Sequence, residues 1–198
     1  MDIKNYINVK ENFLDDITNK RLLKWVKNDV RFVKGSIVGS PSDNKFQIDQ
    51  NVRKVQECFI NNDPRHKLGE SSLTSVFWYN YLVHSFIKVL GEFFHKYNVP
   101  IQQIDPDMHI GIFKYEQTDY YVPHIDYHKT TPRHYSFSYV INDEYEGGDF
   151  QFTLANNEEV IIKPKANSCI MFPSNFMFPH AIKKINSGTR YVAVGWMH

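Results

Sequence analysis

The pattern of hydrophobic and polar positions changes once along the chain, near residue 104. Before that point apolar residues recur at three- and four-residue steps in two stretches, 13–27 and 71–97, and this spacing is typical of amphipathic helices. After it, apolar and polar residues alternate with a period of two, first over residues 108–115, which is typical of a strand. The chain therefore predicts helices in its first half and sheet in its second.

Turn-forming residues divide the second half into many short segments, with turns at 116–119, 142–144, 147–148, 155–158 and 186–188. Short strands separated in this way favour a double-sheet jelly roll, the cupin-like barrel also called a double-stranded β-helix, which has room for a metal between its sheets. We expect a mainly β fold with flanking helices (α+β), in which the N-terminal helices buttress the barrel. Residues 1–198 form one expected domain, with 1–103 as the support region and 104–198 as the jelly-roll core that carries the metal site.

The remainder of the first half predicts smaller elements. Stretches 31–38 and 54–59 alternate well enough for strands, 61–65 is a turn cluster, and 39–50 is a polar loop that we expect to be mobile and a candidate lid. Arg53 has two interpretations, as a pocket residue that touches substrate or as a solvated surface charge, and the second is the more common fate of arginine. His84 and His95 in the long helix are interpreted as structural or surface histidines.

Composition and charge narrow the function classes. The 198 residues carry a formal net charge of +1, which gives no electrostatic case for nucleic acid or an anionic membrane as a partner. The two cysteines are far apart and lack CxxC spacing, so neither a disulfide framework nor a zinc site is expected. No signal-like segment or 18-residue apolar run is visible, and we expect a cytoplasmic protein.

Candidate chemistry centres on His124, Asp126 and a second histidine, His180, which follows 56 residues after the first. Side chains at i and i+2 of a strand point to one face, so His124 and Asp126 can converge while Ile125 turns into the core. Two imidazoles and one carboxylate form the three-ligand face that suits catalytic non-haem Fe(II) and leaves positions open. A surface histidine followed by an aspartate in a turn would give the same isolated pair. Residues further along the chain are therefore needed to distinguish a metal site from this alternative.

Arg190 is the decisive downstream residue. It lies ten residues after His180, in the alternating run 189–196 that is typical of a strand. A buried arginine must be paired because an unpaired guanidinium in an apolar interior carries a heavy desolvation cost. Since no acidic residue lies near it in sequence, a ligand carboxylate is a reasonable partner.

Together these motifs resemble the 2-oxoglutarate and Fe(II)-dependent oxygenases of the prolyl 4-hydroxylase-like family, over about half the chain. The matching parts occur in the family's order: Tyr115 and Tyr121, then His124 and Asp126, then Tyr139 to Asn142, then Gly147-Gly148, then 162–172, then His180, 188–191 and Trp196. One departure stands in the segment 162–172, where Ala166 or Asn167 replaces a usual glycine. It falls in a turn, and asparagine tolerates the positive φ that a glycine there would adopt.

The resemblance implies a set of ligands. It gives His124, Asp126 and His180 to Fe(II), and Arg190 to the far carboxylate of 2-oxoglutarate as cosubstrate. It makes Tyr139 the candidate second donor to that carboxylate and Tyr115 a weaker candidate for the same pocket, and for each the alternative is a core aromatic residue. Ascorbate is a further candidate cofactor by the same resemblance.

The implied reaction consumes O2, decarboxylates 2-oxoglutarate to succinate and CO2, and hydroxylates an aliphatic C–H bond. A prolyl residue in a peptide or protein is the substrate that analogy favours. Residues 127–134, the loop 39–50 and Trp196 are candidate rim elements, and His128 and His134 within the first are interpreted as loop histidines. The open alternatives are a hydroxylase of a free amino acid or other small molecule, a non-oxygenase cupin and a silent 2-oxoglutarate-binding module, while a nucleic-acid demethylase is disfavoured by the neutral charge.

Overall fold

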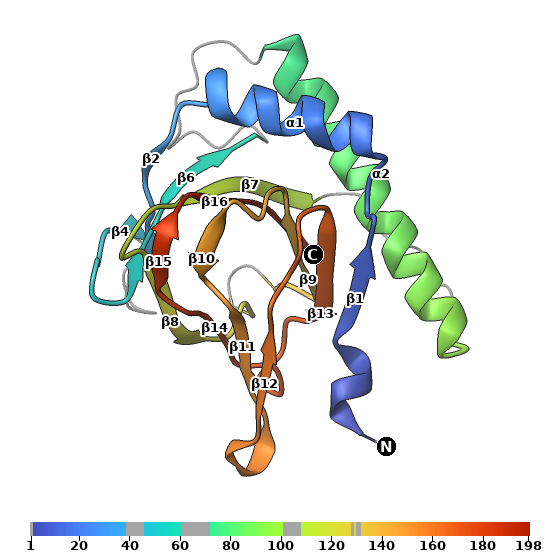
Figure 1. Ribbon diagram of the computed structural model, residues 1–198. Helices are drawn as coiled ribbons and strands as arrows, with labels where there is room; N and C mark the ends of the chain where they lie inside the picture. Colours follow the sequence, from blue (N-terminus) through green and yellow to red (C-terminus); the bar gives the residue numbers. More distant parts are fainter. Residues whose placement is uncertain (1, 39–45, 61–71, 101–107, 128, 130–131) are drawn as a thin grey trace.

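The structure, a computed structural model, describes residues 2–38, 46–60, 72–100, 108–127, 129 and 132–198 (Figure 1). Among these residues, two α-helices lie in the first half, α1 (Asp16–Asn28) and α2 (Leu73–Lys96). The described 3-10 helices are η1 (Ile3–Tyr6) and, in the second half, η2 (Ala155–Asn157). Side chains cap both α-helices at their start: Asp15 accepts from the Thr18 amide and Ser72 from the Ser75 amide. The two helices therefore begin within the stretches that the apolar periodicity predicted.

Two antiparallel sheets face each other and form the barrel. The larger has seven strands in the order β1 (Asn8–Glu11), β13 (Ser168–Pro173), β9 (Tyr135–Val140), β16 (Arg190–Met197), β7 (Met108–Tyr115), β6 (Gln56–Phe59) and β2 (Val33–Lys34). The smaller has five, in the order β12 (Glu159–Ile162), β11 (Phe150–Thr153), β14 (His180–Ile182), β8 (Tyr120–His124) and β5 (Arg53–Lys54). Two further pairs are β10 (Tyr145–Gly147) with β15 (Ile185–Gly188) and β3 (Ile37–Val38) with β4 (Phe46–Gln47).

The larger sheet separates two apolar clusters. On its outer face lie α1 and α2 (Figure 1), and residues such as Leu22, Phe86 and Leu90 pack there against Ile112 and Phe137 of the sheet. On its inner face a second cluster fills the space toward the smaller sheet. This is the mainly β, double-stranded β-helix with flanking helices that the sequence predicted, and that prediction is confirmed.

Several local predictions need correction. The single strand expected at 31–38 is two short ones, β2 and β3, because Gly35 bonds the backbone of Val55 between them, and a Cβ there would lie 2.5 Å from Val55 Cγ1. Ile125 was expected in the core but is 42% exposed, because Asp126 lies beyond the end of β8 and the strict alternation of the strand no longer applies.

Other predictions fall on undescribed positions. Residues 39–45 of the candidate lid and the turn at 61–65 lie outside the described residues, so both stay predictions. Within the described parts of the chain, neither helix combines the length and the apolar composition that crossing a lipid bilayer requires.

Candidate metal centre and cavity

His124 and His180 are cross-strand neighbours in the smaller sheet. They lie opposite each other in the β8–β14 register, with ring centroids 4.3 Å apart. Each ring places Nδ1 beside a backbone carbonyl two residues earlier: 2.9 Å to Val122 for His124 and 3.1 Å to Phe178 for His180. A ring nitrogen that bonds a carbonyl must carry the proton, so the Nε2 lone pair of each imidazole is left for another partner.

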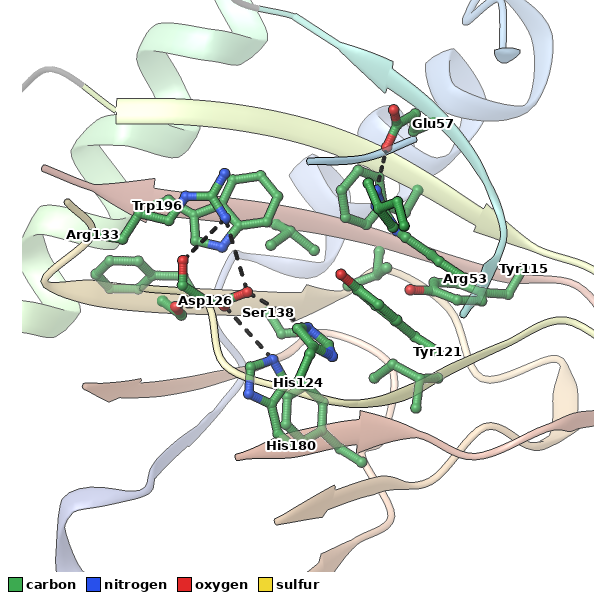
Figure 2. Close-up of a pocket in the computed structure, with 18 of the residues that line it drawn as sticks. Arg53, Glu57, Tyr115, Tyr121, His124, Asp126, Arg133, Ser138, His180 and Trp196 are labelled. Carbon is green, nitrogen blue, oxygen red and sulfur yellow. Dashed lines mark hydrogen bonds and ion pairs between the residues drawn. The ribbon is translucent and has the colours of Figure 1, made fainter. Parts of the chain in front are cut away.

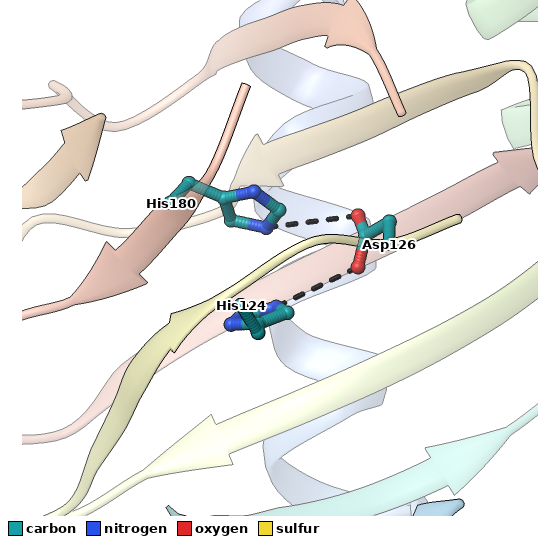
Figure 3. A group of neighbouring side chains, drawn as sticks. All are labelled: His124, Asp126 and His180. Carbon is teal, nitrogen blue, oxygen red and sulfur yellow. Dashed lines mark ion pairs between the residues drawn. The ribbon is translucent and has the colours of Figure 1, made fainter. Parts of the chain in front are cut away.

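Asp126 completes the group from the loop after β8 (Figure 3). Its Oδ1 lies 3.5 Å from His124 Nε2 and its Oδ2 lies 3.6 Å from His180 Nε2. Ligands bonded to a metal at about 2.1 Å and at right angles lie roughly 3 Å apart, and these separations are close to that value. The three ligand atoms all lie within 4.8 Å of one another, so the sequence-predicted trio converges on one point.

The electrostatics of the trio favour the protonation states that a cation requires. Burial opposes the charge of Asp126, but His180, His124 and Arg133 together hold its pKa well below the usual value. Burial, followed by the neighbouring His124, lowers the pKa of His180 to about 4. At neutral pH the carboxylate is therefore charged and the His180 imidazole is neutral, as metal ligands must be.

Arg190 lies on the opposite wall, in β16 of the larger sheet. It stands opposite Tyr115 of β7 in the strand register, and its guanidinium carbon lies 5.4 Å from the centroid of that ring. The side chain is fully buried, and none of Nε, Nη1 and Nη2 has a hydrogen-bond partner among the described residues. A buried cation without a partner faces the same cavity as the trio, so the cavity has a place for an anion.

The structure separates the two candidate tyrosines. Tyr115 lines the cavity with Arg190, whereas Tyr139 packs on the helix side of the larger sheet, where its hydroxyl donates to Asn19 and Asn167 over 2.5 and 3.2 Å. Its assignment to the cosubstrate pocket is therefore corrected. The cause is strand parity: in β9 the side chains of Ser136 and Ser138 reach the cavity, so Tyr139 must face the other way.

Arg53 also departs from its favoured interpretation. It is 7% exposed and lines the cavity (Figure 2). Its guanidinium carbon lies 4.6 Å from the Phe113 ring centroid. Its Nη1 lies 2.8 Å from the carboxylate of Glu57, which is fully buried, and donates to the Ser36 carbonyl over 2.6 Å. The surface interpretation was wrong, because an acidic partner four residues later in the chain offsets the desolvation cost of burying this arginine.

Two side chains from the expected rim meet beside the metal centre. The Arg133 guanidinium lies over Trp196 at 4.1 Å from the ring centroid, and it donates to the backbone carbonyl of Asp126 over 3.4 Å (Figure 2). Trp196 is 6% exposed, and its indole N–H has no partner among the described residues. His134 is exposed, as a loop histidine would be, and His128 lies outside the described residues.

Three residues around the cavity were not predicted: Glu57, Ser136 and Ser174. Ser136 bonds Asp126 directly, and Ser174 bonds Ser136. The period-two pattern over 135–140 held a usable signal for Ser136, since a polar residue on the cavity-facing parity of a buried strand needs a partner. Glu57 had a local signal, since Arg53 stands four residues before it, whereas Ser36 lies 21 residues from Glu57 and Ser136 lies 38 residues from Ser174.

Comparisons with known proteins agree with this geometry. Residues 110–198 match the family model described as the 2OG-Fe(II) oxygenase superfamily. A PKHD-type hydroxylase of the cyanobacterium Synechococcus is 36% identical over 92 residues, which are 44% of this chain and 40% of that protein. Human prolyl 3-hydroxylase 2 is 38% identical over 68 residues, 33% of this chain and 10% of that one. The aligned segments thus span less than half the length of these relatives.

Solved structures extend the likeness to nearly the whole chain. A prolyl hydroxylase of Trichoplax adhaerens, in complex with a hypoxia-inducible-factor oxygen-degradation-domain peptide, has a TM-score of 0.74 at 19% identity, covering 98% of this chain and 83% of that one. A Pseudomonas putida prolyl 4-hydroxylase has a TM-score of 0.68 at 14% identity, covering 98% and 92%. At such identities these neighbours establish the fold. Residues 110–198 are therefore similar in sequence to the 2OG-Fe(II) oxygenase superfamily, and the fold of nearly the whole chain is similar to that of the solved prolyl hydroxylases.

Proposed function

We propose that this chain is an Fe(II)- and 2-oxoglutarate-dependent dioxygenase that hydroxylates an aliphatic C–H bond, with a prolyl residue of a peptide or protein as its substrate. The observation that carries the proposal is the pairing of two features across one cavity. His124, Asp126 and His180 converge on one wall, and the partnerless guanidinium of Arg190 is buried in the other.

The donor set fits iron. Two neutral imidazoles and one carboxylate are the protein ligands of non-haem Fe(II) oxygenases, and they leave coordination positions open. Each imidazole is already aimed, because its Nδ1 proton is held by a backbone carbonyl. Asp126 offsets one of the two metal charges.

The opposite wall fits a dicarboxylate. A planar guanidinium can hold a carboxylate through two parallel hydrogen bonds, and each charge-assisted bond contributes roughly 1.5–3 kcal/mol. Arg190 would bind the far carboxylate of 2-oxoglutarate in this way, with the Tyr115 hydroxyl beside it as a second donor. The 2-oxo acid end of the cosubstrate would then face the three metal ligands.

The chemistry that iron would supply differs from the part that the protein's own residues play. When bound, iron would activate O2, of which one oxygen atom ends in succinate as 2-oxoglutarate loses CO2 and the other is inserted into the C–H bond. The chain binds, orients and shields: Phe150 stacks on the His180 ring with centroids 5.2 Å apart, and Phe172 meets the same ring edge-on at 4.7 Å. These aromatic contacts fix the ligand ring and exclude water from its far side.

The substrate assignment draws support from the relatives and from the rim. Several of the similar proteins are named prolyl hydroxylases, and one neighbour structure contains a peptide. Trp196 presents an apolar ring and an unpartnered indole N–H beside the metal centre, which suits a ring-shaped aliphatic group next to a peptide carbonyl. Ascorbate as an additional cofactor stays a prediction.

One anaerobic experiment tests the iron and cosubstrate assignments. Adding Fe(II) and 2-oxoglutarate should give the weak visible charge-transfer band of the chelate, and His180→Ala and Arg190→Ala should each diminish it. Matched controls are His84→Ala and Arg21→Ala, which remove an exposed histidine and an exposed arginine from the two helices. A wild-type protein with neither the band nor turnover of 2-oxoglutarate would contradict the proposal and leave a silent module or a non-oxygenase cupin.

A second experiment tests the substrate. Prolyl peptides and free amino acids are incubated with the loaded enzyme in air, and mass spectrometry looks for a gain of one oxygen atom. Hydroxylation of prolyl peptides alone is the expected result. Hydroxylation of free amino acids alone would keep the enzyme class and replace the substrate.

A further inference from the structure

Ser136 binds the one carboxylate of the metal centre. It lies in β9 with 1% of its surface exposed, and its Oγ is 2.6 Å from Asp126 Oδ2. Because an ionised carboxylate only accepts hydrogen bonds, Ser136 is the donor. Its single hydroxyl proton is thereby committed to Asp126.

Ser174, directly after β13, is the next member of the chain of hydrogen bonds. Its Oγ lies 2.7 Å from the Oγ of Ser136, and it is also 1% exposed. Since Ser136 has no second proton, Ser174 must donate at this contact. The backbone fixes Ser174 on both sides: its N–H donates to the His134 carbonyl over 3.0 Å, and its carbonyl accepts from the Tyr127 amide over 2.9 Å.

Asp126 depends on such a hydrogen bond for its orientation more than the two histidines do. Each histidine lies in a strand, and a backbone carbonyl holds its ring, whereas Asp126 lies beyond the end of β8. A carboxylate rotates about its terminal bond with a broad, roughly two-fold preference. A donor on Oδ2 restricts that rotation, and Oδ1, which lies 3.5 Å from His124 Nε2 and 4.0 Å from Arg133 Nη1, is the oxygen that Ser136 does not bind.

We propose that Ser136, itself oriented by Ser174, is a positioning residue that sets the Asp126 carboxylate so that the metal binds through Oδ1. The inference rests on the proposed function, because it requires that the trio bind a divalent metal. It adds a dedicated hydrogen-bond relay, from Ser174 to Ser136 to Asp126, which ties the carboxylate to the larger sheet while both imidazoles belong to the smaller one.

The test measures Co(II) binding to the metal-free protein, because Co(II) absorption reports both affinity and coordination geometry. Ser136→Ala should weaken binding about 10- to 100-fold, the usual cost of losing a partner of a metal ligand, and should change the shape of the visible spectrum. Ser136→Thr keeps the hydroxyl in a residue that suits a strand and should restore most of the affinity and the spectrum.

The matched control is Ser168→Ala. Ser168 is also buried in the larger sheet and its hydroxyl donates to the Lys165 carbonyl over 2.6 Å, but it does not line the cavity. It should lose a comparable amount of thermal stability and keep wild-type Co(II) affinity. A relay that only stabilised the fold would instead make the two alanine variants alike in affinity.

The order of the relay gives a second readout. Ser174→Ala should weaken Co(II) binding less than Ser136→Ala does, and the double variant should bind no more weakly than Ser136→Ala alone, because Ser174 acts through Ser136. If Ser136→Ala fails to fold, Ser174→Ala and Ser136→Thr carry the comparison. Additive losses, or wild-type affinity in Ser136→Ala, would overturn the relay while leaving the metal site in place; absence of Co(II) binding in the wild type would overturn the proposed function itself.

Discussion

Among the described residues, Arg190 has the most buried polar side-chain atoms without a hydrogen-bond partner. Three buried guanidinium nitrogens lack hydrogen-bond partners, which destabilises the unliganded fold. A dicarboxylate would supply these partners, so the same nitrogens favour its binding. We predict that Arg190→Met raises the thermal stability of the ligand-free protein, because an apolar side chain of similar length removes an uncompensated charge. The same variant should bind 2-oxoglutarate roughly 10²- to 10⁴-fold more weakly, as the loss of two charge-assisted bonds implies.

Calorimetric titration and thermal unfolding measure both effects on one preparation. Arg21→Met serves as the control, since Arg21 is exposed on α1 and should change neither quantity appreciably. A destabilised Arg190→Met with wild-type 2-oxoglutarate affinity would show that Arg190 has a structural partner instead of a ligand.

The order of motifs in the sequence was enough to predict some residues of the site. Residues that come together only through the fold were not predicted. The trio and Arg190 stand at fixed spacings, so they were named in advance. Tyr139 was assigned from its place before Asn142, although the alternation of the strand puts it on the face opposite Ser138. For Arg53 no sequence signal outweighed the usual exposure of arginine, because its burial depends on Glu57 and on the carbonyl of Ser36.

Among the elements, β13 is joined to the segment before α1 through one asparagine. Asn167 has φ of +60°, donates to the Leu14 carbonyl over 2.8 Å and accepts from the Leu14 amide over 2.9 Å. We predict that Asn167→Gly, which tolerates this φ, costs about 2–4 kcal/mol of unfolding free energy, because both buried backbone groups of Leu14 lose their partner. Asn167→Ala should cost about 1–2 kcal/mol more, since alanine also resists the left-handed conformation.

Urea unfolding of the two variants gives the graded series. Asn12 has φ of +52° but is exposed, so Asn12→Gly is the control and should be close to neutral. Equal losses for Asn167→Gly and Asn12→Gly would mean that the side-chain bonds to Leu14 contribute nothing. The departure from the family's glycine at this turn thus has a structural role that the sequence alone predicted only as tolerance of positive φ.

A buried ion pair links β5 and β6 to the segment before β3. Glu57 binds Arg53 and also accepts from the Ser36 amide and hydroxyl, both over 3.1 Å. We predict that Glu57→Gln destabilises the fold by about 3–5 kcal/mol in urea, because it leaves the Arg53 charge buried without compensation. Glu92→Gln, in an exposed pair with Lys10, should cost less than about 1 kcal/mol.

The double variant Arg53→Met/Glu57→Leu separates the two causes. Replacing both charges with apolar side chains of similar size should recover most of the lost stability, as for other buried pairs. If the double variant stays as unstable as Glu57→Gln, the hydrogen bonds from Ser36 are the larger contribution.

For the whole molecule, the sequence predicted the architecture, but it did not predict the division of the site residues between the two sheets. The change of period near residue 104 and the turn signals were enough for a helix-supported jelly roll, because the two long helices before that point and the strands after it each follow one periodicity. Which sheet carries which residue depends on strand order, in which β16 pairs with β7 and β9 while β14 pairs with β8 and β11. Such long-range pairings leave no local trace in the sequence.

That division has a consequence for ligand binding. The three metal ligands belong to the smaller sheet and the loop after β8, and Arg190 to the larger, so a chelate of metal and 2-oxoglutarate would join the two sheets. We predict that Fe(II) and 2-oxoglutarate together, without oxygen, raise the melting temperature by roughly 10–20 °C at about 100 times their dissociation constants. The combined rise should exceed the sum of the two separate rises, because each ligand contacts the other.

Thermal scans with metal, with cosubstrate and with both provide the comparison, and a chelator should reverse the combined rise. In His180→Ala the metal-dependent part should disappear while a small effect of 2-oxoglutarate at Arg190 persists. Merely additive shifts in the wild type would mean that the two ligands bind without touching. The cavity would then not be the place where they meet, even if each binds, because ligands that share one chelate must stabilise each other's binding.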